Sequence, residues 1–512
     1  MTGNDRALPR RETAPLLAAI DLGSNSFRLE IAQVQRGRYK RLDYLKETVR
    51  LGGGLDAQGM LTEEATQRGL ACLARFSERL RDFAATHVRA VATQTLREAR
   101  NRDAFLSRAQ AVLGHPIEVI SGREEARLIY AGVARLMPPA QGRCLVIDIG
   151  GRSTEMILGE GRTPVVAESF QVGSVGLSVR YFADGRFTPE AFRAAQVAAG
   201  AELEEALETF APQHWRQALG SSGTVGAVSQ VLAANGVTDG TITPEGLRWC
   251  IAQCLRAGRI EALEMAGLKE DRRAVLGGGL SILYTLAAQF GIEALTPARG
   301  ALRQGVIFDL DERLHAAARV GGRAHGHDMR DDSVRQLQER FHVDVAQAER
   351  VREVALALYD RLEPHPRGES RRELEWAAQL HELGMSVSHH DHHRHSAYLL
   401  AHVDAAGFSQ SQQRRLAALV LGQRGGLRKI EESLQEEAFA WQVLALRLAV
   451  LLCHARRTPD LRAIDLVREG ATARLELDPN WAENHPRTLY LLDEEREAWD
   501  RTGALRLRLG KP

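Results

Sequence analysis

Residues 16–31 read LLAAIDLGSNSFRLEI, and residues 145–158 read LVIDIGGRSTEMIL. In both stretches an apolar run reaches an aspartate, passes through a small glycine- and serine-containing turn, and continues as a second run. This pattern is typical of two antiparallel strands joined by a tight loop. When Asp21 is placed over Asp148, the first glycine and the serine of the two loops coincide. The similarity predicts two related lobes, each with one strand-loop-strand hairpin.

Both loops have the chemistry of a phosphate site. Consecutive backbone N–H groups in a tight glycine turn form a concave anion site, and hydroxyl groups add further donors. An aspartate at the end of the preceding strand can bind Mg²⁺ directly or through water. One such loop alone is most simply an ordinary hairpin with an Asx-type turn. Two matched loops instead predict that a phosphate chain is held between two lobes.

The sequence around these loops alternates strands and helices up to about residue 310, which favours α/β lobes. Helical periodicity marks residues 62–84 and 96–112. Thr188 and Thr243 each precede a proline, as N-cap residues do. The glycine-rich, charged stretch that follows predicts a linker. Beyond it almost everything reads as helix to about residue 457, and later alternation predicts a small sheet near the end of the chain.

Composition limits the classes of function. The chain has 512 residues, 44% of them hydrophobic, and a formal net charge of +1. A near-neutral balance argues against a general nucleic-acid coat and against an acidic disordered tail. No apolar run is long enough to cross a bilayer, and the start lacks the apolar core of a secretory signal. Five cysteines in so long a chain make no disulfide framework. We therefore expect a cytosolic protein without a transmembrane segment, with peripheral membrane association left open.

Several motifs in one order identify a resemblance. They are the two aspartate loops, 92–101 (ATQTLREARN), 121–126 (SGREEA), 170–175 (FQVGSV), 220–224 (GSSGT) and 300–305 (GALRQG). Together they resemble the exopolyphosphatase and guanosine pentaphosphate phosphatase family, within the actin, Hsp70 and sugar-kinase superfold. The resemblance implies an α/β fold of two ribonuclease-H-like (actin-like) lobes around a cleft, then an all-α HD-like domain and a small C-terminal α+β segment. The expected boundaries are a flexible tail 1–15, lobe I 16–134, lobe II 135–310, a linker 311–332, an HD-like domain 333–458 and a C-terminal domain 459–512.

The resemblance also implies roles for single residues. Ser121 and Glu124 have the spacing of a helix capping box, which leaves Glu125 free, and relatives use the matching glutamate as general base. Asp148 is the second catalytic residue, and Asp148, Asp21 and Glu155 are the candidate Mg²⁺ ligands. The expected phosphate-binding residues are Gly23, Ser24, Asn25, Ser26, Arg97, Gly150, Gly151, Arg152, Ser153, Thr154, Ser222, Gly223 and Thr224.

Two positions depart from the family pattern. The family usually reads DIGGGSTE, and here Arg152 replaces the third glycine. If that position needs a positive φ, arginine costs about 1 kcal/mol or somewhat more. Arg152 can instead supply another phosphate donor, so we expect retained but altered activity. Gly277 stands where proline is common in relatives, and we expect it to change only the local loop shape. The glycines at 277–279 resemble later phosphate and nucleoside contacts of the superfold.

The helical half is rich in histidine, with seven of the 17 histidines between residues 381 and 402. Taken alone, this indicates metal binding. The segment resembles HD-type phosphohydrolases, but the His-Asp pair has become His381-Glu382 and the later aspartate is missing, with Leu452, Cys453 and His454 in its place. We favour a degenerate HD domain that holds substrate over a second metallohydrolase.

The predicted function is an exopolyphosphatase that releases orthophosphate from the end of linear inorganic polyphosphate. Implied with it are Mg²⁺, with stimulation by K⁺ left open, a homodimer, and no nucleic-acid partner. A guanosine pentaphosphate (pppGpp) 5′-phosphohydrolase would need the same loops and base. A sugar-kinase-like phosphotransferase and a non-catalytic nucleotide or polyphosphate sensor are the alternatives of a different class.

Overall fold

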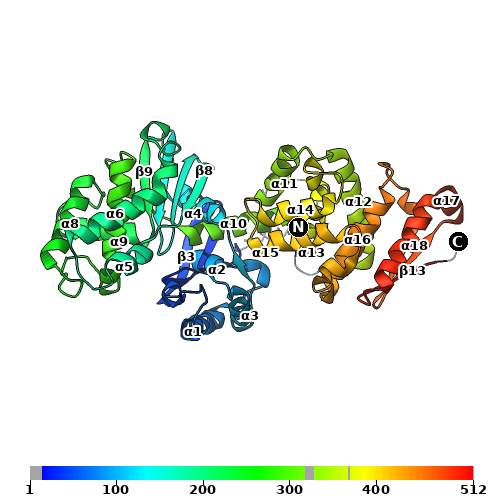
Figure 1. Cartoon of the computed structure of the whole chain (residues 1–512), viewed down its shortest axis with the longest axis horizontal. Coiled ribbons are helices and arrows are strands. Elements are labelled where there is room, and N and C mark those ends of the chain that lie inside the picture. Colours follow the sequence, from blue (N-terminus) through cyan, green and yellow to red (C-terminus); the bar gives the residue numbers. More distant parts are fainter. Residues whose placement is uncertain (1–13, 318–327, 367–368, 511–512) are drawn as a thin grey trace, which may run out of the picture. The chain divides into compact units, whose positions relative to one another are not determined.

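The computed structural model describes residues 14–317, 328–366 and 369–510. The chain divides into two compact units between His327 and Asp328 (Figure 1). The expected tail, residues 1–15, lies almost wholly outside the described residues. Each unit has its own buried core and is described here by itself.

The first unit contains two five-stranded sheets. The first has the order β3-β2-β1-β4-β5, in which β1 pairs antiparallel with β2 and parallel with β4. All six residues of β1 are buried, which explains the apolar run that precedes Asp21. The strands are β1 (Leu17–Leu22), β2 (Ser26–Gln35), β3 (Arg38–Thr48), β4 (Val88–Ala92) and β5 (Ile117–Val119).

The second sheet repeats the first. Its order is β10-β9-β6-β7-β8, and β6 pairs antiparallel with β7 and parallel with β9. Each sheet therefore begins with three antiparallel strands in chain order and adds two parallel ones beside the first strand. The strands are β6 (Arg143–Ile149), β7 (Thr154–Glu160), β8 (Thr163–Phe170), β9 (Gln217–Ser221) and β10 (Leu295–Pro297). The two predicted hairpins are confirmed as β1-β2 and β6-β7.

Ten α-helices connect these strands in the described part of the first unit. They are α1 (Glu63–Leu80), α2 (Gln94–Glu98), α3 (Arg102–Leu113), α4 (Gly122–Leu136), α5 (Ser174–Tyr181), α6 (Pro189–Leu203), α7 (Ser222–Ala234), α8 (Pro244–Ala257), α9 (Glu270–Gln289) and α10 (Leu302–Ala317). Thr188 and Thr243 cap α6 and α8 as predicted.

One predicted helix is in fact two. Residues 96–112 are divided between α2 and α3, because the backbone of Ala99 is extended. The Asn101 side chain holds the break: it accepts a hydrogen bond from the Leu61 N–H at 2.8 Å and donates to the Leu61 carbonyl at 3.0 Å. Periodicity alone could not show this, since the partner lies 40 residues earlier.

Of the predicted linker, residues 311–332, the structure describes 311–317 and 328–332, and nearly all of these are helical. α10 continues to Ala317 and packs against α4 and β1, and the next helix begins at Met329. The interior of the expected linker, residues 318–327, lies outside the described residues. α10 therefore packs on the first lobe, although the sequence placed its start at the end of the second.

The glycines at 277–279 lie inside helix α9, where a loop was expected. A Cβ at Gly278 would collide with the backbone and hydroxyl groups of α5, and one at Gly277 would press on the Phe182 ring. These glycines allow α5 to pack closely on α9. Their role is helix packing, so the expected change in loop shape at Gly277 is wrong.

The second unit is helical and ends in a three-stranded sheet, as predicted. Its elements are α11 (Met329–Arg340), α12 (Val345–Leu362), α13 (Ser370–Leu380), α14 (His392–His402), α15 (Gln410–Gly422), α16 (Glu437–Leu452), β11 (Ile464–Glu469), β12 (Thr472–Leu477), α17 (Pro479–Asn484), α18 (Pro486–Asp500) and β13 (Arg506–Leu509). Among the described residues of the whole chain, no helix is both long and apolar enough to span a bilayer.

Candidate active site

The first loop joins β1 to β2 and is held from both sides. Asp21 is the last residue but one of β1 and stands opposite Arg28 in the strand register, with 3.7 Å between the carboxylate and the guanidinium. Arg303 of α10 approaches the same carboxylate at 3.5 Å. The Thr95 hydroxyl of α2 donates to the Ser24 hydroxyl at 2.8 Å. These contacts fix the loop that carries Ser24, Asn25 and Ser26.

The second loop joins β6 to β7 and is clamped by the start of α5. The Gly150 N–H donates to the Ser153 carbonyl at 2.9 Å, which closes the turn. The Ser174 N–H and hydroxyl both donate to the Gly150 carbonyl at 3.0 Å. A Cβ on Gly173 would collide with the backbone of the loop, so only glycine allows this approach.

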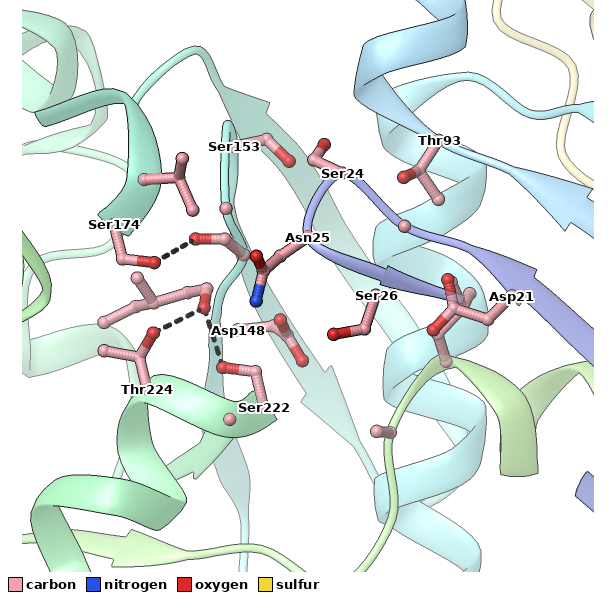
Figure 2. Close-up of a pocket in the computed structure, with 18 of the residues that line it drawn as sticks. Asp21, Ser24, Asn25, Ser26, Thr93, Asp148, Ser153, Ser174, Ser222 and Thr224 are labelled. Carbon is pink, nitrogen blue, oxygen red and sulfur yellow. Dashed lines mark hydrogen bonds between the residues drawn. The ribbon is translucent and has the colours of Figure 1, made fainter. Parts of the chain in front are cut away.

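The two loops face one another across a single cavity of about 100 Å³. Figure 2 shows Asn25 and Ser26 of the first loop and Asp148 and Ser153 of the second around the same space. The structure therefore brings Asp21 and Asp148 into one cleft. The predicted residues that line it are Asp21, Gly23, Ser24, Asn25, Ser26, Glu125, Asp148, Gly150, Gly151, Ser153, Ser222, Gly223 and Thr224.

The beginning of α7 forms a third wall. The hydroxyl groups of Ser222 and Thr224 both donate to the Ile149 carbonyl, at 2.8 and 3.1 Å (Figure 2). Ser222 has a φ of +80°, a conformation that costs a non-glycine residue energy. A strained backbone persists only where surrounding contacts enforce it, and such residues are common at functional sites.

Glu125 lies in the first turn of α4 and lines the cavity. Ser121 caps this helix by accepting from the Glu124 N–H, and the Glu124 carboxylate is directed to Arg127 at 2.7 Å. The first half of the predicted capping box is thus present. Arg97 donates to the Glu125 carboxylate at 2.8 Å. Burial raises the pKa of Glu125, and Arg97 opposes that rise.

Burial also raises the pKa of two other carboxyl groups in this region. Desolvation raises the pKa of Asp148 to about 7, against a hydrogen bond from Ser221 that lowers it. Burial also raises the pKa of Glu155, and the negative charges of Glu125 and Asp148 add to the rise. Burial is the largest cause of the rise at each of these carboxyl groups, so the charged form of each is costly unless a cation or a proton neutralises it.

Four predicted site residues do not line the cavity. Arg97 donates a hydrogen bond to the Glu125 carboxylate. The Glu155 carboxylate accepts a hydrogen bond from the Ser169 hydroxyl at 2.8 Å, outside the cavity lining. The Thr154 hydroxyl donates to the Val172 carbonyl at 2.6 Å. Arg152 binds Glu98 of α2, with 2.7 Å between guanidinium and carboxylate. In this structure the side chains of these four residues are bound by protein groups and lie outside the cavity lining.

Arg152 also causes no backbone strain. Its φ is not positive, so the energetic cost of an arginine in a left-handed conformation does not arise. Its Nη1 lies 3.4 Å from the Gly52 carbonyl in the first lobe. Arginine at position 152 therefore adds a contact between the lobes and leaves the geometry of the turn unchanged.

Three arginines that sequence analysis did not single out line the cavity: Arg28, Arg272 and Arg303. Buried Arg28 Nε and Ser26 Oγ have no hydrogen-bond partner among the described residues. Burial and the nearby charge of Arg28 lower the pKa of Arg272. Donors left without partners indicate that an anionic ligand completes this side of the cleft. Arg28 could have been found from its position in the first hairpin, and Arg303 from the 300–305 motif, whereas only the tertiary structure places Arg272.

The residues also fit Mg²⁺. Asp21 and Asp148 offer carboxylate oxygens in the cleft, and burial makes the charged form of Asp148 costly without a nearby cation. No three histidine, cysteine, aspartate or glutamate side chains group as a metal cage in the described chain. Mg²⁺ commonly takes one or two carboxylates and completes its shell with water and substrate phosphate. Asp148, with Asp21 beside it, is the pair suited to that mode.

In the histidine-rich segment of the second unit, an arginine binds the His381-Glu382 pair that stands in place of a His-Asp metal pair. Arg456 binds both carboxylate oxygens of Glu382, at 2.8 and 2.9 Å. The His381 imidazole lies 3.9 Å from the same carboxylate, and burial lowers its pKa. The guanidinium thus supplies the positive charge that balances Glu382.

The second unit also has an open hollow of about 420 Å³ with a basic lining. Its charged residues are Asp391, Arg394, Arg428 and Lys429, and His393 and two glycines complete the lining. Burial and the charges of Arg447 and Arg394 lower the pKa of Lys429 to about 8. The excess of positive charge favours anions here.

Comparisons with known proteins match both units of the chain to one family. A family model described as the Ppx/GppA phosphatase family matches residues 30–314, and one described as Ppx/GppA phosphatase, domain III, matches residues 329–496. A solved exopolyphosphatase from Cytophaga hutchinsonii is similar at 26% identity and a TM-score of 0.53, over 58% of this chain and 98% of that chain. A solved exopolyphosphatase-like protein is similar at 26% identity and a TM-score of 0.52, with the same coverage. The first match contains Glu125 and Asp148, and the first loop precedes it.

Proposed function

Because the chain belongs to the Ppx/GppA phosphatase family, we propose that it is an exopolyphosphatase acting on the end of linear inorganic polyphosphate. The observation that carries the proposal is the single cleft in which two matched loops, a buried glutamate and the unpartnered donors Arg28 Nε and Ser26 Oγ meet. A phosphate chain satisfies all three groups at once.

Glu125 is suited to act as the general base. It lines the cavity, and burial raises its pKa toward the working pH, where a base is most effective. The carboxylate accepts a proton from water as the water oxygen attacks the terminal phosphorus. The bridging P–O bond breaks, and orthophosphate leaves while the shortened chain keeps the former bridging oxygen. Arg97 keeps the carboxylate in place during this step.

The loops and arginines hold the phosphates. Backbone N–H groups and hydroxyl groups of both loops donate to non-bridging oxygens, and Arg28, Arg272 and Arg303 balance their charge. Mg²⁺, when bound near Asp148, would supply additional charge neutralisation. Stimulation by K⁺ is part of the same proposal and rests on the family resemblance alone.

The lining of the cleft favours a phosphate chain over a nucleotide. None of the described residues around the cavity is aromatic, so it offers no stacking surface for a guanine. The glycines of α9 that resembled nucleoside contacts are covered, Gly277 and Gly278 by α5 with Phe182 and Gly279 by Thr224 of α7. These features support polyphosphate over pppGpp as the preferred substrate.

The test is a side-by-side measurement of phosphate release from long-chain polyphosphate and from pppGpp, each with Mg²⁺. We expect a higher kcat/KM for polyphosphate. Release from pppGpp without release from polyphosphate would overturn the choice of substrate. Tight binding without release from either would favour a sensor, and dependence on ATP with a phosphorylated acceptor as product would favour a phosphotransferase. A homodimer is expected in solution, which sedimentation can check.

A further inference from the structure

A continuous chain of hydrogen bonds runs from the second phosphate loop to the proposed base. Arg152 Nε donates to Glu98 Oε2 at 3.0 Å, and Gln94 Nε2 donates to Glu98 Oε1 at 2.6 Å. Arg97 Nε and Nη2 donate to Gln94 Oε1 at 2.9 and 2.7 Å. Arg97 Nη1 donates to Glu125 Oε2 at 2.8 Å. Each of the two Glu98 oxygens therefore serves a different neighbour.

Three residues of this hydrogen-bonded series lie on α2, a helix of five residues. Thr95 of the same helix donates to Ser24 of the first loop at 2.8 Å. The helix thus contacts the first loop through Thr95, the second loop through Glu98 and the base through Arg97. So short a helix has few internal hydrogen bonds, so its orientation depends on these external contacts.

The charged side chains of this hydrogen-bonded series alternate in sign. Arg152 is positive, Glu98 negative, Arg97 positive and Glu125 negative. Arg152 and Glu98 are about 30% exposed, whereas Gln94 is 7% exposed. If the charge on Arg152 is removed, Glu98 keeps only its hydrogen bond from Gln94, and a shift of Glu98 then moves Gln94 and Arg97 relative to the base.

We infer that Arg152 is a positioning residue: its contact with Glu98 fixes α2, and α2 holds the Glu125 carboxylate. The inference rests on the proposed function and adds to it a link between the lobes. The residue that replaces the usual glycine of the second loop makes the orientation of the base depend on contact between that loop and α2 of the first lobe. Arg152 acts without touching substrate.

The experiment measures kcat and KM for tripolyphosphate in R152Q, R152K and E98Q. We expect R152Q and E98Q to lower kcat about 10-fold, the scale of a misplaced catalytic group, while KM changes less than about twofold. R152K keeps a charged donor for Glu98 and should restore most of kcat. The double variant R152Q/E98Q should be no slower than R152Q, because both changes break the same link.

The matched control is K46Q. Lys46 of β3 also pairs with a residue of the second lobe, Asp271 of α9, at 3.2 Å. Neither residue belongs to the chain of contacts that ends at Glu125. K46Q should therefore keep the wild-type kcat, which separates the proposed link from a general loss of ion pairs between lobes.

Two results would overturn the inference. A raised KM with unchanged kcat in R152Q would mean that Arg152 binds phosphate directly. An unchanged kcat in both R152Q and E98Q would mean that the contact does not position the base. Either result leaves the proposed function intact if the wild type still releases phosphate and E125Q does not. Failure of the wild type to release phosphate would instead contradict the proposed function.

Discussion

At the scale of single residues, the chemistry depends on Glu125. E125Q keeps the size of the side chain and removes its ability to take a proton. We expect phosphate binding to stay close to wild type and kcat to fall by ~10²-fold or more, the scale of general-base loss. Phosphate release and isothermal titration measure the two quantities. E160Q, at the exposed end of β7, is the control, and unchanged turnover in E125Q would remove Glu125 from the mechanism.

Asp148 links function to stability. Burial raises the pKa of its carboxyl from an ordinary 3.8 to about 7. The protonated Asp148 carboxyl therefore makes its full contribution to the free energy of unfolding below about pH 4. This contribution is lost as the pH rises through about 7. D148N has no charge to bury, so in EDTA its free energy of unfolding should exceed that of the wild type at pH 8, by on the order of 1 kcal/mol or more.

Urea unfolding of D148N and the wild type at pH 5 and pH 8 checks this expectation. The advantage of D148N should be larger at pH 8, while its phosphate release is lost. A difference that is the same at both pH values would show that the Asp148 carboxyl does not carry the shifted titration.

At the scale of elements, the close contact of α4 and α10 places Glu125. A Cβ on Gly305 of α10 would collide with the Leu128 carbonyl of α4. G305A should therefore lower the free energy of unfolding by about 1–3 kcal/mol, as overpacking does. It should also reduce kcat, because α4 carries the base.

Thermal and urea unfolding measure the loss in G305A. G226A is the control, since a Cβ at Gly226 in α7 meets nothing within 4 Å and alanine favours a helix. G226A should be neutral or slightly more stable. Equal stability of G305A and the wild type would mean that the two helices can separate without cost.

At the scale of the whole molecule, every residue that lines the cavity belongs to the first unit. A fragment of residues 1–327, which retains all of α10, should release phosphate from tripolyphosphate with a kcat within about threefold of the full chain. Its unfolding should remain cooperative. A folded fragment without activity would show that the second unit takes part in the chemistry.

The basic hollow of the second unit leads to a separate prediction. R428Q/K429Q should raise KM for long-chain polyphosphate several-fold and leave KM for tripolyphosphate unchanged, because a long polyanion can use a second cationic site. The effect should shrink as salt is raised. R462Q, an exposed arginine paired with Asp460, is the control. Equal effects on both chain lengths would contradict a holding role.

The sequence by itself determined the two hairpins, their duplication and the residues that line the cleft from each loop. These features are local, because strand alternation and a glycine turn are encoded by neighbouring residues. Glu125 also came from the sequence, through its place after a capped helix start and through the family resemblance. The helix caps at Thr188 and Thr243 depend on two adjacent residues and were equally accessible.

Only the tertiary structure decided which partners the charged side chains take. Arg152 was expected to bind phosphate and binds Glu98, which lies 54 residues earlier. Arg272 reaches the cleft, and Arg456 reaches Glu382, through helix packing that joins distant segments. A long arginine side chain can reach many groups, and the one it binds depends on burial and on the backbone around it. Such choices are made by long-range packing, and no local pattern contains them.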